Sequence, residues 1–244
     1  MKAVVMAGGV GSRLRPITDD IPKPLVPIDG TPVMGHVLEL MRHHGVTDAV
    51  VTVRYRADQI IDHFGDGDGV GVKLTYLRER EQPLGTAGAV YAARHLLDTD
   101  EPFLVISSDA LTDIDLTRLA RFHATHPGIA TLCLTEVEDP TGLGVVELAP
   151  DGEIRRFVEK PAPGTAPSNT ANTGIYLMDP RILRWITPHG ACDWATDVFP
   201  RLMTARQPLY GCTPGGYWRD IGTHQQLAMA RGDAVRGTWR PPVR

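Results

Sequence analysis

The 244-residue sequence predicts a mixed α/β fold, in which a mainly parallel sheet is covered by helices on both faces. Short apolar runs of strand length alternate with stretches of helix length through the first half of the chain. In the second half, strand-like runs follow one another with little helix between them. We therefore expect an inserted region that is more antiparallel than the rest of the sheet.

The expected strands of the first half are short and apolar. They are Ala3–Met6, Ala49–Val53, Val72–Leu77 and Phe103–Ile106. The helices expected between them are Thr31–His44, Ala57–Phe64 and Thr86–Leu97. The first helix has the clearest ends, because Thr31 and Pro32 resemble an N-cap and a first helical residue and Gly45 occupies a C-cap position.

The second half has a different pattern, with closely spaced strands and one hairpin turn at Asp151-Gly152. The expected strands are Ala130–Val137, Gly144–Leu148, Ile154–Val158, Thr173–Met178, Pro208–Cys212 and Tyr217–Asp220. The expected helices are Pro180–Ile186, Trp194–Ala205 and Thr223–Gly232. Because no repeat or linker interrupts this order, we expect one domain over residues 1–244.

Composition excludes several classes of partner. The net charge of −4 gives no electrostatic footprint for nucleic acid or for an anionic membrane. The apolar runs are too short to span a bilayer, and no signal-peptide core opens the chain, so we expect a cytoplasmic protein. Cys133, Cys192 and Cys212 lack the spacing of a zinc site or a disulfide framework, and we expect three buried thiols.

A glycine-rich loop follows the first strand, at the edge of a parallel sheet where ligands bind. Gly8, Gly9 and Gly11 let the backbone approach a ligand closely, and the cations that follow suggest that this ligand is an anion. Walker A is excluded because no Gly-Lys-Ser/Thr is present, and the dinucleotide fingerprint is excluded because Leu14 stands where a third small residue is needed. A simple tight turn remains the alternative from the glycines alone.

The segments "GGVGSRLRP" and "PKPLVP" together resemble the signature of the sugar-1-phosphate nucleotidylyltransferases. The resemblance implies a Rossmann-like nucleotide-diphospho-sugar transferase fold. It also implies that the loop holds a nucleotide and that Lys23 contacts its phosphates. The loop residues carried over are Ala7, Gly8, Gly9, Gly11, Ser12 and Arg13.

Three further segments match elements of the same family in the same order. "QPLGTAGAV" implies that Gly85 and Thr86 contact the base and ribose, although both also suit a turn and a helix cap. "ISSDALTDIDL" implies that Asp109 is a metal ligand, with Ser108 in place of the usual glycine. "GYWRDIGT" implies that Asp220 is a second Mg²⁺ ligand. By the resemblance, Arg13, Lys23, Asp109 and Asp220 form the catalytic set.

The remaining matches imply a sugar-phosphate site. "GLGVV" implies that the Gly144 backbone touches the sugar, and "FVEKP" implies that Glu159 and Lys160 bind the sugar hydroxyls and the sugar phosphate. "NTGIY" implies sugar contacts by Asn172 and close backbone approach at Gly174, with Thr173 in place of alanine. Without these companions, Glu159 and Lys160 would be interpreted as solvated charges at a strand end.

The implied reaction joins a nucleoside triphosphate and a sugar 1-phosphate with Mg²⁺, and releases pyrophosphate. The motifs are most similar to bacterial mannose-1-phosphate guanylyltransferases, so GTP and mannose 1-phosphate are the expected substrates. Another nucleotide, or a heptose or cyclitol phosphate, stays open. A non-catalytic regulatory subunit that binds nucleotide sugars is an alternative function. The sequence also leaves open whether the chain forms a homo-oligomer. A dinucleotide-dependent oxidoreductase is disfavoured because the dinucleotide fingerprint is not present.

The resemblance also divides the chain by function. It implies a nucleotide-binding part over about residues 1–110 and a sugar-binding part over about residues 111–235. Many members of this family carry a C-terminal left-handed β-helix, and because the sequence given ends at "GTWRPPVR" we expect no such module in it.

Overall fold

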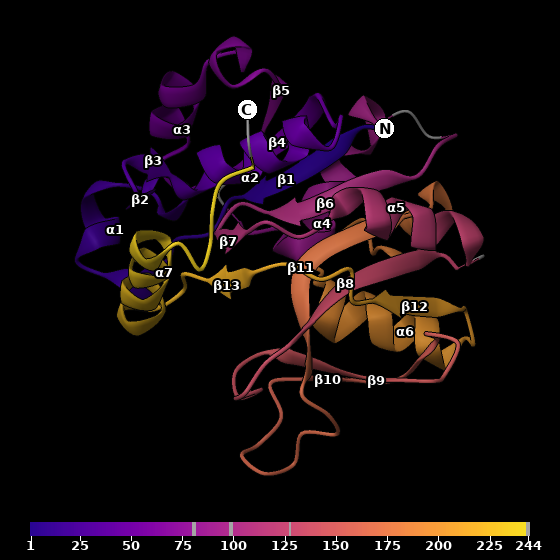
Figure 1. The fold of residues 1–244 in the computed structure, drawn as a ribbon. Helices are drawn as coiled ribbons and strands as arrows, with labels where there is room; N and C mark the ends of the chain where they lie inside the picture. Colours follow the sequence, from indigo (N-terminus) through magenta and orange to yellow (C-terminus); the bar gives the residue numbers. More distant parts are fainter. Residues whose placement is uncertain (80–81, 98–99, 127, 243–244) are drawn as a thin grey trace. The chain divides into compact units, whose positions relative to one another are not determined.

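The computed structural model of the chain describes residues 1–79, 82–97, 100–126 and 128–242 (Figure 1). Two compact units are present, and each is built from separate stretches of sequence. The first unit comprises Met1–Pro83, Ile106–Asp115 and Gly216–Arg244, and the second comprises Leu84–Val105 and Leu116–Gly215.

The first unit is built on parallel strands. Strand β1 (Ala3–Ala7) pairs in parallel with β4 (Asp48–Val53), which pairs in parallel with β5 (Lys73–Arg78). The last residues of β6 (Phe103–Ser107) also belong to this unit, next to β1. The Val- and Ala-rich strands β1 and β4 are almost entirely buried, as expected for a parallel sheet covered on both faces.

Helices connect these strands as the sequence predicts. Helix α3 spans Ala57–Phe64, as expected, whereas α2 begins at Val33 and ends at His43. The expected start of α2 at Thr31 was wrong. Thr31–Pro32 instead forms the short strand β3, which pairs with β2 (Pro27–Ile28) and leaves Pro32 as the residue before the helix.

Several short elements and the helix α7 complete the first unit. They are η1 (Ser12–Leu14), α1 (Ile17–Asp20), η2 (Lys23–Leu25), η3 (Asp68–Val70), β7 (Ala110–Thr112), β13 (Trp218–Asp220) and α7 (His224–Arg236). One apolar core joins distant parts of the chain, since Leu14 and Val33 pack with Leu111, Ile221 and Trp239. The C-terminal helix is therefore part of the same core as the N-terminal loop.

The second unit is mainly antiparallel. Strand β11 (Thr170–Met178) pairs antiparallel with β8 (Ala130–Glu136) and β9 (Gly144–Leu148), and β9 pairs antiparallel with β10 (Ile154–Glu159). Strand β12 (Leu209–Cys212) adds a parallel pair with β8. In Figure 1 the connection between β10 and β11 extends as a loop without helix or strand. The mixed α/β fold with a mainly parallel central sheet is confirmed, as is the more antiparallel second region.

The helices of the second unit depart most from expectation. They are α4 (Gly85–Ala92), η4 (Ala93–Leu96), α5 (Leu116–Thr125), η5 (Pro180–Trp185), η6 (Trp194–Val198) and α6 (Phe199–Thr204). The single helix expected over 194–205 is a π-helical turn followed by an α-helix. Pro200 explains the break, because it lacks an N–H and is accommodated only in the first turn of a helix.

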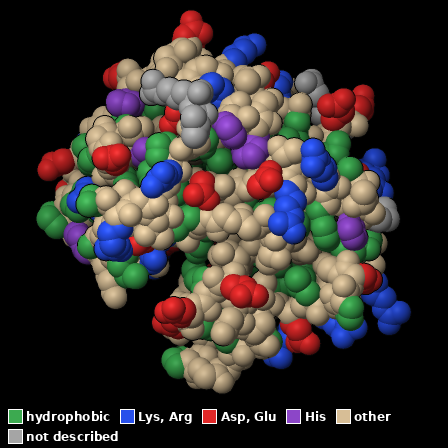
Figure 2. All heavy atoms as spheres, viewed as in Figure 1, with side chains coloured by type: hydrophobic (Ala, Val, Ile, Leu, Met, Phe, Trp, Pro, Cys, Tyr) green, Lys and Arg blue, Asp and Glu red, His purple; other side chains and the backbone are tan. Residues whose placement is uncertain are grey.

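The three cysteines are free and buried, as expected. None of the helices in the described part of the chain is long and apolar enough to cross a membrane. Acidic and basic side chains are interspersed on the face shown in Figure 2.

Candidate active site

The glycine loop after β1 is shaped by close contacts on one side and open space on the other. Gly11 has a left-handed backbone (φ 68°), and a β-carbon there would lie 3.2 Å from Cβ of Lys23. A β-carbon on Gly8 would lie 2.5 Å from Oε1 of Glu79, whereas one on Gly9 would meet no described atom within 4 Å. The loop therefore packs against Lys23 and presents the backbone around Gly9 to solvent.

Lys23 is a buried cation held between two carboxylates of the first unit. Its side chain is only 9% exposed, and its Nζ lies 2.7 Å from Oδ2 of Asp109 and 3.1 Å from Oδ1 of Asp220. Burial by itself would lower the pKa of Lys23, but the charges of Asp109 and Asp220 outweigh burial and raise this pKa. Lys23 is therefore protonated whenever these acids are ionised.

The two carboxylates come from distant parts of the sequence and are brought together by a small two-stranded ribbon. Asp109 follows β6, and Asp220 ends β13, where it pairs with Ala110 of β7. The Ile221 N–H donates to the Asp109 carbonyl (3.2 Å), which continues the ribbon past the site. Residues 111 positions apart thus lie next to each other because β7 and β13 are in register.

The environments of the two acids differ. Burial opposes ionisation of Asp109, but Lys23 and the hydroxyl of Ser107, which donates to Oδ1, outweigh it and lower the pKa of Asp109. Burial and the charge of Asp109 raise the pKa of Asp220, and Lys23 offsets this only in part. The pKa of Asp109 is thus lowered and that of Asp220 raised, and Lys23 lies closer to Asp109 (2.7 Å) than to Asp220 (3.1 Å).

Arg13 reaches the same region from the glycine loop and is exposed. A β-carbon on Gly222 would lie 2.9 Å from Nη2 of Arg13 and 2.4 Å from Oδ2 of Asp220. A side chain at residue 222 would therefore displace the Arg13 guanidinium or the Asp220 carboxylate from its present position. The motif that contains Asp220 also contains Gly222, so the signal for this residue was already in the sequence.

The donor set suits Mg²⁺. One oxygen of each carboxylate contacts the same ammonium group, so both carboxylates face a common cation position. Mg²⁺ takes oxygen ligands, often one or two carboxylates together with waters and substrate phosphates. Among the described residues, no three His, Cys, Asp or Glu side chains gather as a metal site.

In the second unit, the start of α4 is closed by the segment 192–194, here called the 192–194 strap. The Cys192 carbonyl accepts from the N–H groups of Ala87 (2.9 Å) and Gly88 (3.0 Å). The Asp193 carboxylate accepts from the N–H (2.9 Å) and the hydroxyl (2.8 Å) of Thr86. The strap therefore takes up the first N–H groups of the helix, which would otherwise lack partners.

The strap also restricts Gly85 by close contact and engages the hydroxyl of Thr86 in hydrogen bonds. Gly85 has a φ of 74°, and a β-carbon there would lie 2.5 Å from the Cys192 carbonyl oxygen. The Thr86 hydroxyl donates to Asp193 and accepts from the Trp194 N–H (3.1 Å). The helix-cap interpretation of this motif thus has direct contacts in the structure, and Asp193 is a residue that the sequence interpretation gave no role.

Three of the expected sugar-binding residues converge on neighbouring strands of the second unit. Gly144 of β9 pairs with Glu159 of β10, and a β-carbon on Gly144 would lie 2.8 Å from Oε2 of Glu159 and 3.5 Å from Cβ of Asn172. The Asn172 amide donates to the Tyr176 hydroxyl (2.9 Å). Tyr176 is buried, and burial raises its pKa. Tyr176 is a further polar member of this cluster.

Lys160 and Gly174 sit at the edges of this cluster in unusual backbone conformations. Lys160 has a φ of 47°, its N–H donates to the Leu143 carbonyl (3.0 Å), and its side chain is 64% exposed. Its Nζ lies 3.2 Å from Oε1 of Glu159. Gly174 has a φ of 77°, and its N–H donates to Oδ1 of Asn172 (3.2 Å).

Comparison with known proteins identifies the family. The profile of the family described as Nucleotidyl transferase matches residues 2–235. The chain belongs to the nucleotidyl transferase family.

Similar proteins carry several nucleotide specificities in their names. The chain is 37% identical over 233 residues to a UTP–glucose-1-phosphate uridylyltransferase of Synechocystis, covering 91% of this chain and 60% of the relative. It is 39% identical over 226 residues to a mannose-1-phosphate guanyltransferase of Schizosaccharomyces pombe, covering 91% and 61%. The chain thus spans about 60% of the length of these curated relatives.

A solved structure confirms the fold. A putative glucose-1-phosphate thymidylyltransferase from Bacillus anthracis, in complex with sucrose, superposes with a TM-score of 0.85 at 26% identity. The match covers 95% of this chain and 94% of that chain.

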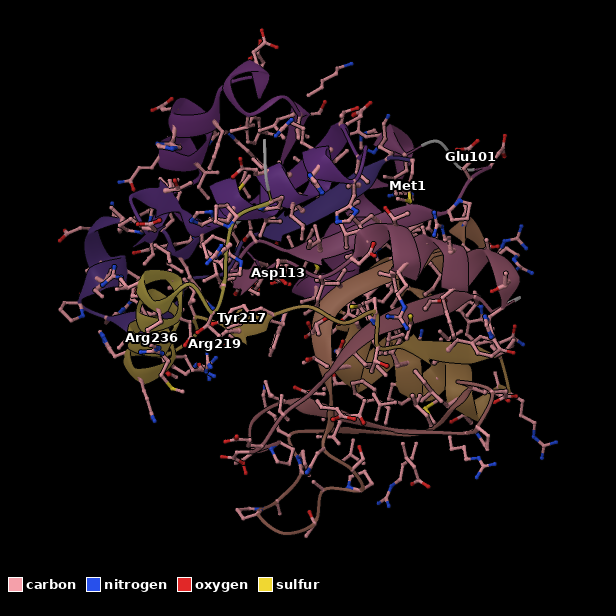
Figure 3. The ribbon with its side chains drawn as sticks, in the orientation of Figure 1. Met1, Glu101, Asp113, Tyr217, Arg219 and Arg236 are labelled. Carbon is pink, nitrogen blue, oxygen red and sulfur yellow. The ribbon has the colours of Figure 1, made fainter. Side chains whose placement is uncertain are left out.

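A polar network of this nucleotidyl transferase chain supports the strand that carries Asp220. Oδ2 of the buried Asp233 accepts from the Tyr217 hydroxyl (2.7 Å) and from Nε of Arg219 (2.9 Å). Its Oδ1 accepts from Arg236 (2.6 Å). Figure 3 labels Tyr217 and Arg219 at β13 and Arg236 on α7. The sequence offered no signal for this network, because pairing across 14 or 16 residues follows no local periodicity.

Proposed function

We propose that the chain transfers a nucleotidyl group from a nucleoside triphosphate to a sugar 1-phosphate, with GTP and mannose 1-phosphate as the preferred pair. The observation that carries this proposal is the buried Lys23, held between Asp109 and Asp220 beside the open glycine loop. A cation and two acids next to a loop with exposed backbone suit a polyphosphate and a divalent metal.

In the proposed reaction, an oxygen of the sugar phosphate attacks the α-phosphorus and the bond from that phosphorus to the bridging oxygen of pyrophosphate breaks. The attacking oxygen is already ionised near neutral pH, because the second pKa of a phosphate monoester is about 6. No general base is needed. The protein has to bring two polyanions together and neutralise the charge of the leaving group.

The roles follow from position and charge. Arg13 is exposed and carries a fork of donors suited to the triphosphate, and Ala7, Gly8, Gly9, Gly11 and Ser12 provide the surrounding backbone. Lys23 neutralises phosphate charge from beneath the loop. Asp109 and Asp220 would hold Mg²⁺, which would supply further charge neutralisation at the phosphates.

The second unit provides the acceptor site in this proposal. Glu159 and Asn172 would bind sugar hydroxyls, with the backbone of Gly144 and Gly174 close to the ring. Lys160, whose exposed side chain places Nζ 3.2 Å from Oε1 of Glu159, would bind the sugar phosphate. Gly85 and Thr86 would contact the base and ribose in this proposal, and the N–H and hydroxyl of Thr86 both already donate to Asp193.

The deciding experiment measures pyrophosphate release with Mg²⁺ for ATP, CTP, GTP, TTP and UTP, each with mannose, glucose and heptose 1-phosphates. The proposal expects the highest kcat/KM with GTP and mannose 1-phosphate, and loss of release in EDTA. Release with another pair would overturn the substrate assignment and keep the reaction. Nucleotide-sugar binding without release from any pair would favour the regulatory subunit instead.

A further inference from the structure

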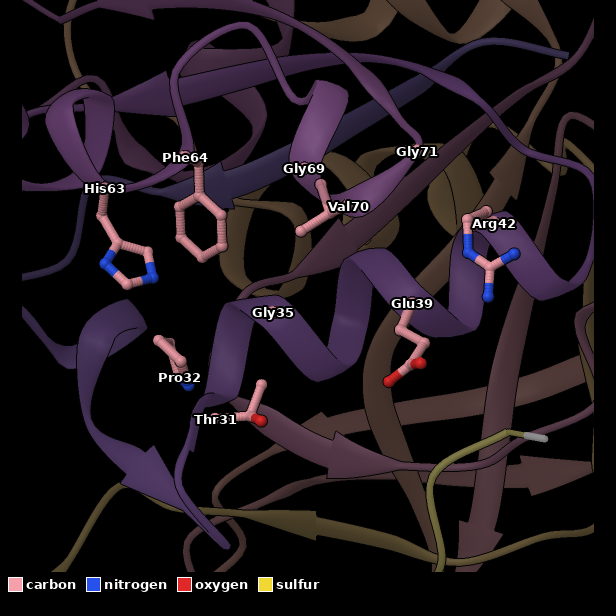
Figure 4. A pocket seen from close by; sticks show the side chains of 10 residues that line it. All are labelled: Thr31, Pro32, Gly35, Glu39, Arg42, His63, Phe64, Gly69, Val70 and Gly71. Carbon is pink, nitrogen blue, oxygen red and sulfur yellow. The ribbon is translucent and has the colours of Figure 1, made fainter. Parts of the chain in front are cut away.

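A cavity in the first unit is lined by residues that the proposed reaction does not use. Its volume is about 550 Å³, within the range of small-molecule sites (Figure 4). Its walls come from β3, α2, the end of α3, and η3 with the glycine that follows it. The lining residues are Thr31, Pro32, Gly35, Glu39, Arg42, His63, Phe64, Gly69, Val70 and Gly71.

The cavity is apolar at one end. In Figure 4 the rings of Phe64 and Pro32 and the side chain of Val70 surround the space above the first turn of α2. The His63 ring packs edge-on against Phe64, with centroids 4.7 Å apart. Gly35 removes a side chain from the helix surface here. This end suits a flat, largely apolar group such as an aromatic ring.

The other end carries charge. Arg42 lies two turns along α2 from Gly35, a distance of about 10 Å. Its aliphatic part packs on Gly71, where a β-carbon would lie 2.7 Å from Cδ of Arg42. Within the described ranges, the Arg42 guanidinium makes no hydrogen bond or ion pair with another residue. An arginine at the end of a cavity, without an acidic partner, is suited to an anionic ligand group.

The middle of the cavity is polar. Glu39 lies one turn before Arg42 on the same side of α2, and the Thr31 hydroxyl lines the floor. A carboxylate accepts hydrogen bonds from ligand hydroxyls, and its negative charge limits the number of phosphates that the cavity accepts. One cation together with one acid suits a ligand with a single phosphate.

We propose that this cavity binds a nucleoside monophosphate, with the base between Phe64, Pro32 and Val70, the ribose hydroxyls at Glu39 and the phosphate at Arg42. Helix α2 also contacts η2, which carries Lys23, and β7, which follows Asp109. Occupancy of the cavity therefore places a ligand against the same helix that supports the buried charge cluster. The proposal goes beyond the proposed function and does not require it.

The test is a titration of the ¹⁵N-labelled chain with GMP, followed by NMR. Glycine amides report on both locations, because Gly35, Gly69 and Gly71 line the cavity and Gly8, Gly9 and Gly11 form the loop. We expect saturable shifts of the cavity glycines. Arg42→Gln should raise the Kd for GMP obtained from these shifts about tenfold or more, since a hydrogen bond to a charged group is lost. Val70→Trp, which fills the cavity, should abolish them.

Arg121→Gln serves as the matched control, because Arg121 is exposed on α5 of the other unit. It should leave the shifts of the cavity glycines unchanged. Shifts confined to the loop glycines would overturn the cavity proposal and support nucleotide binding at the loop. Shifts confined to the cavity glycines would support the cavity, and the proposed function would still be tested by pyrophosphate release from the triphosphate. Cavity shifts that survive both Arg42→Gln and Val70→Trp would also overturn the proposal.

Discussion

The two lysines that the sequence places near phosphate are held in opposite ways. Lys23 in the first unit is 9% exposed and lies between two carboxylates, whereas Lys160 in the second unit is 64% exposed and contacts one. A buried cation with two partners is fixed before substrate arrives, and its removal leaves buried negative charge without compensation. An exposed cation is hydrated and contributes mainly when a ligand displaces its water. Two lysines that both match family motifs can therefore contribute very different free energies to folding and binding.

The largest expected effect is that of Lys23→Met. Turnover should fall about 10²- to 10³-fold, because one preorganised positive group at the phosphates is lost. The free energy of unfolding should also fall by about 3 kcal/mol, since Asp109 and Asp220 then face each other without a cation. Pyrophosphate release and urea unfolding measure the two effects.

Lys73→Met provides the control for Lys23→Met, because Lys73 is an exposed lysine of β5. Added Mg²⁺ should restore part of the lost stability in Lys23→Met and have little effect on Lys73→Met. Equal stability of the two variants in EDTA would contradict the buried charge cluster.

Gly85→Ala tests whether the second unit is also held in place before substrate binds. Here the backbone contact of Gly85 with Cys192, and not a buried charge, would fix the structure. The substitution should lower the free energy of unfolding by about 3 kcal/mol, because the methyl group meets Cys192 and the backbone is left-handed. Gly69→Ala has open space around its β-carbon and should cost much less. Comparable thermal melting of the two variants would show that the 192–194 strap yields to the methyl group.

The buried His36 should make the stability of the first unit sensitive to acid. His36 of α2 donates from Nε2 to the Ile28 carbonyl (2.9 Å) and packs edge-on against Trp239, and burial lowers its pKa. The unfolded chain takes up this proton near pH 6.5, whereas the folded chain does so only at lower pH. His36 therefore favours the folded state above about pH 6.5, and this contribution is lost as the pH falls below that value.

His36→Gln keeps a donor for Ile28 and cannot titrate. The free energy of unfolding, measured by urea denaturation at several pH values between about 7 and 5, should fall less steeply in this variant than in the unchanged chain. Identical slopes would mean that His36 does not resist protonation in the folded state.

The smallest expected effect concerns the backbone of Lys160. At a φ of 47°, glycine is favoured over other residues by about 1 kcal/mol, so Lys160→Gly should be more stable than Lys160→Ala by about that amount. Both variants should raise the KM for the sugar 1-phosphate about tenfold and leave the KM for the triphosphate near its original value. Equal stability of the two variants would argue against backbone strain at this residue.

Sequence reasoning succeeded where a motif is local and failed where a contact joins distant segments. The strands β1 and β4 and helix α3 follow from the apolar pattern. The family motifs imply that Lys23, Asp109 and Asp220 belong to one catalytic set, but they did not predict the ion pairs that join them. The hydrogen bonds of Asp233 with Tyr217 and Arg219 follow no such pattern, since each depends on how α7 packs. The start of α2 was misplaced because Thr31-Pro32 suits both a cap and a short strand, and only pairing with Pro27–Ile28 decides between them.

The contacts of the 192–194 strap with α4 also join distant segments and could not be predicted from the sequence. The motif around Gly85 and Thr86 was interpreted both as a nucleotide contact and as a turn with a helix cap, but neither interpretation named its partners Cys192 and Asp193. Their separation of more than 100 residues hides this requirement from any local interpretation of the sequence.

The order in which the first unit is assembled has a consequence for synthesis. Its glycine loop, Lys23 and Asp109 are all translated before residue 110, whereas Asp220 and the core residues Ile221, Leu227 and Trp239 come last. A chain still on the ribosome at residue 215 would hold Lys23 with one carboxylate, an incomplete core and an unpaired β7. The unit that begins synthesis can therefore finish folding only after the second unit has been made.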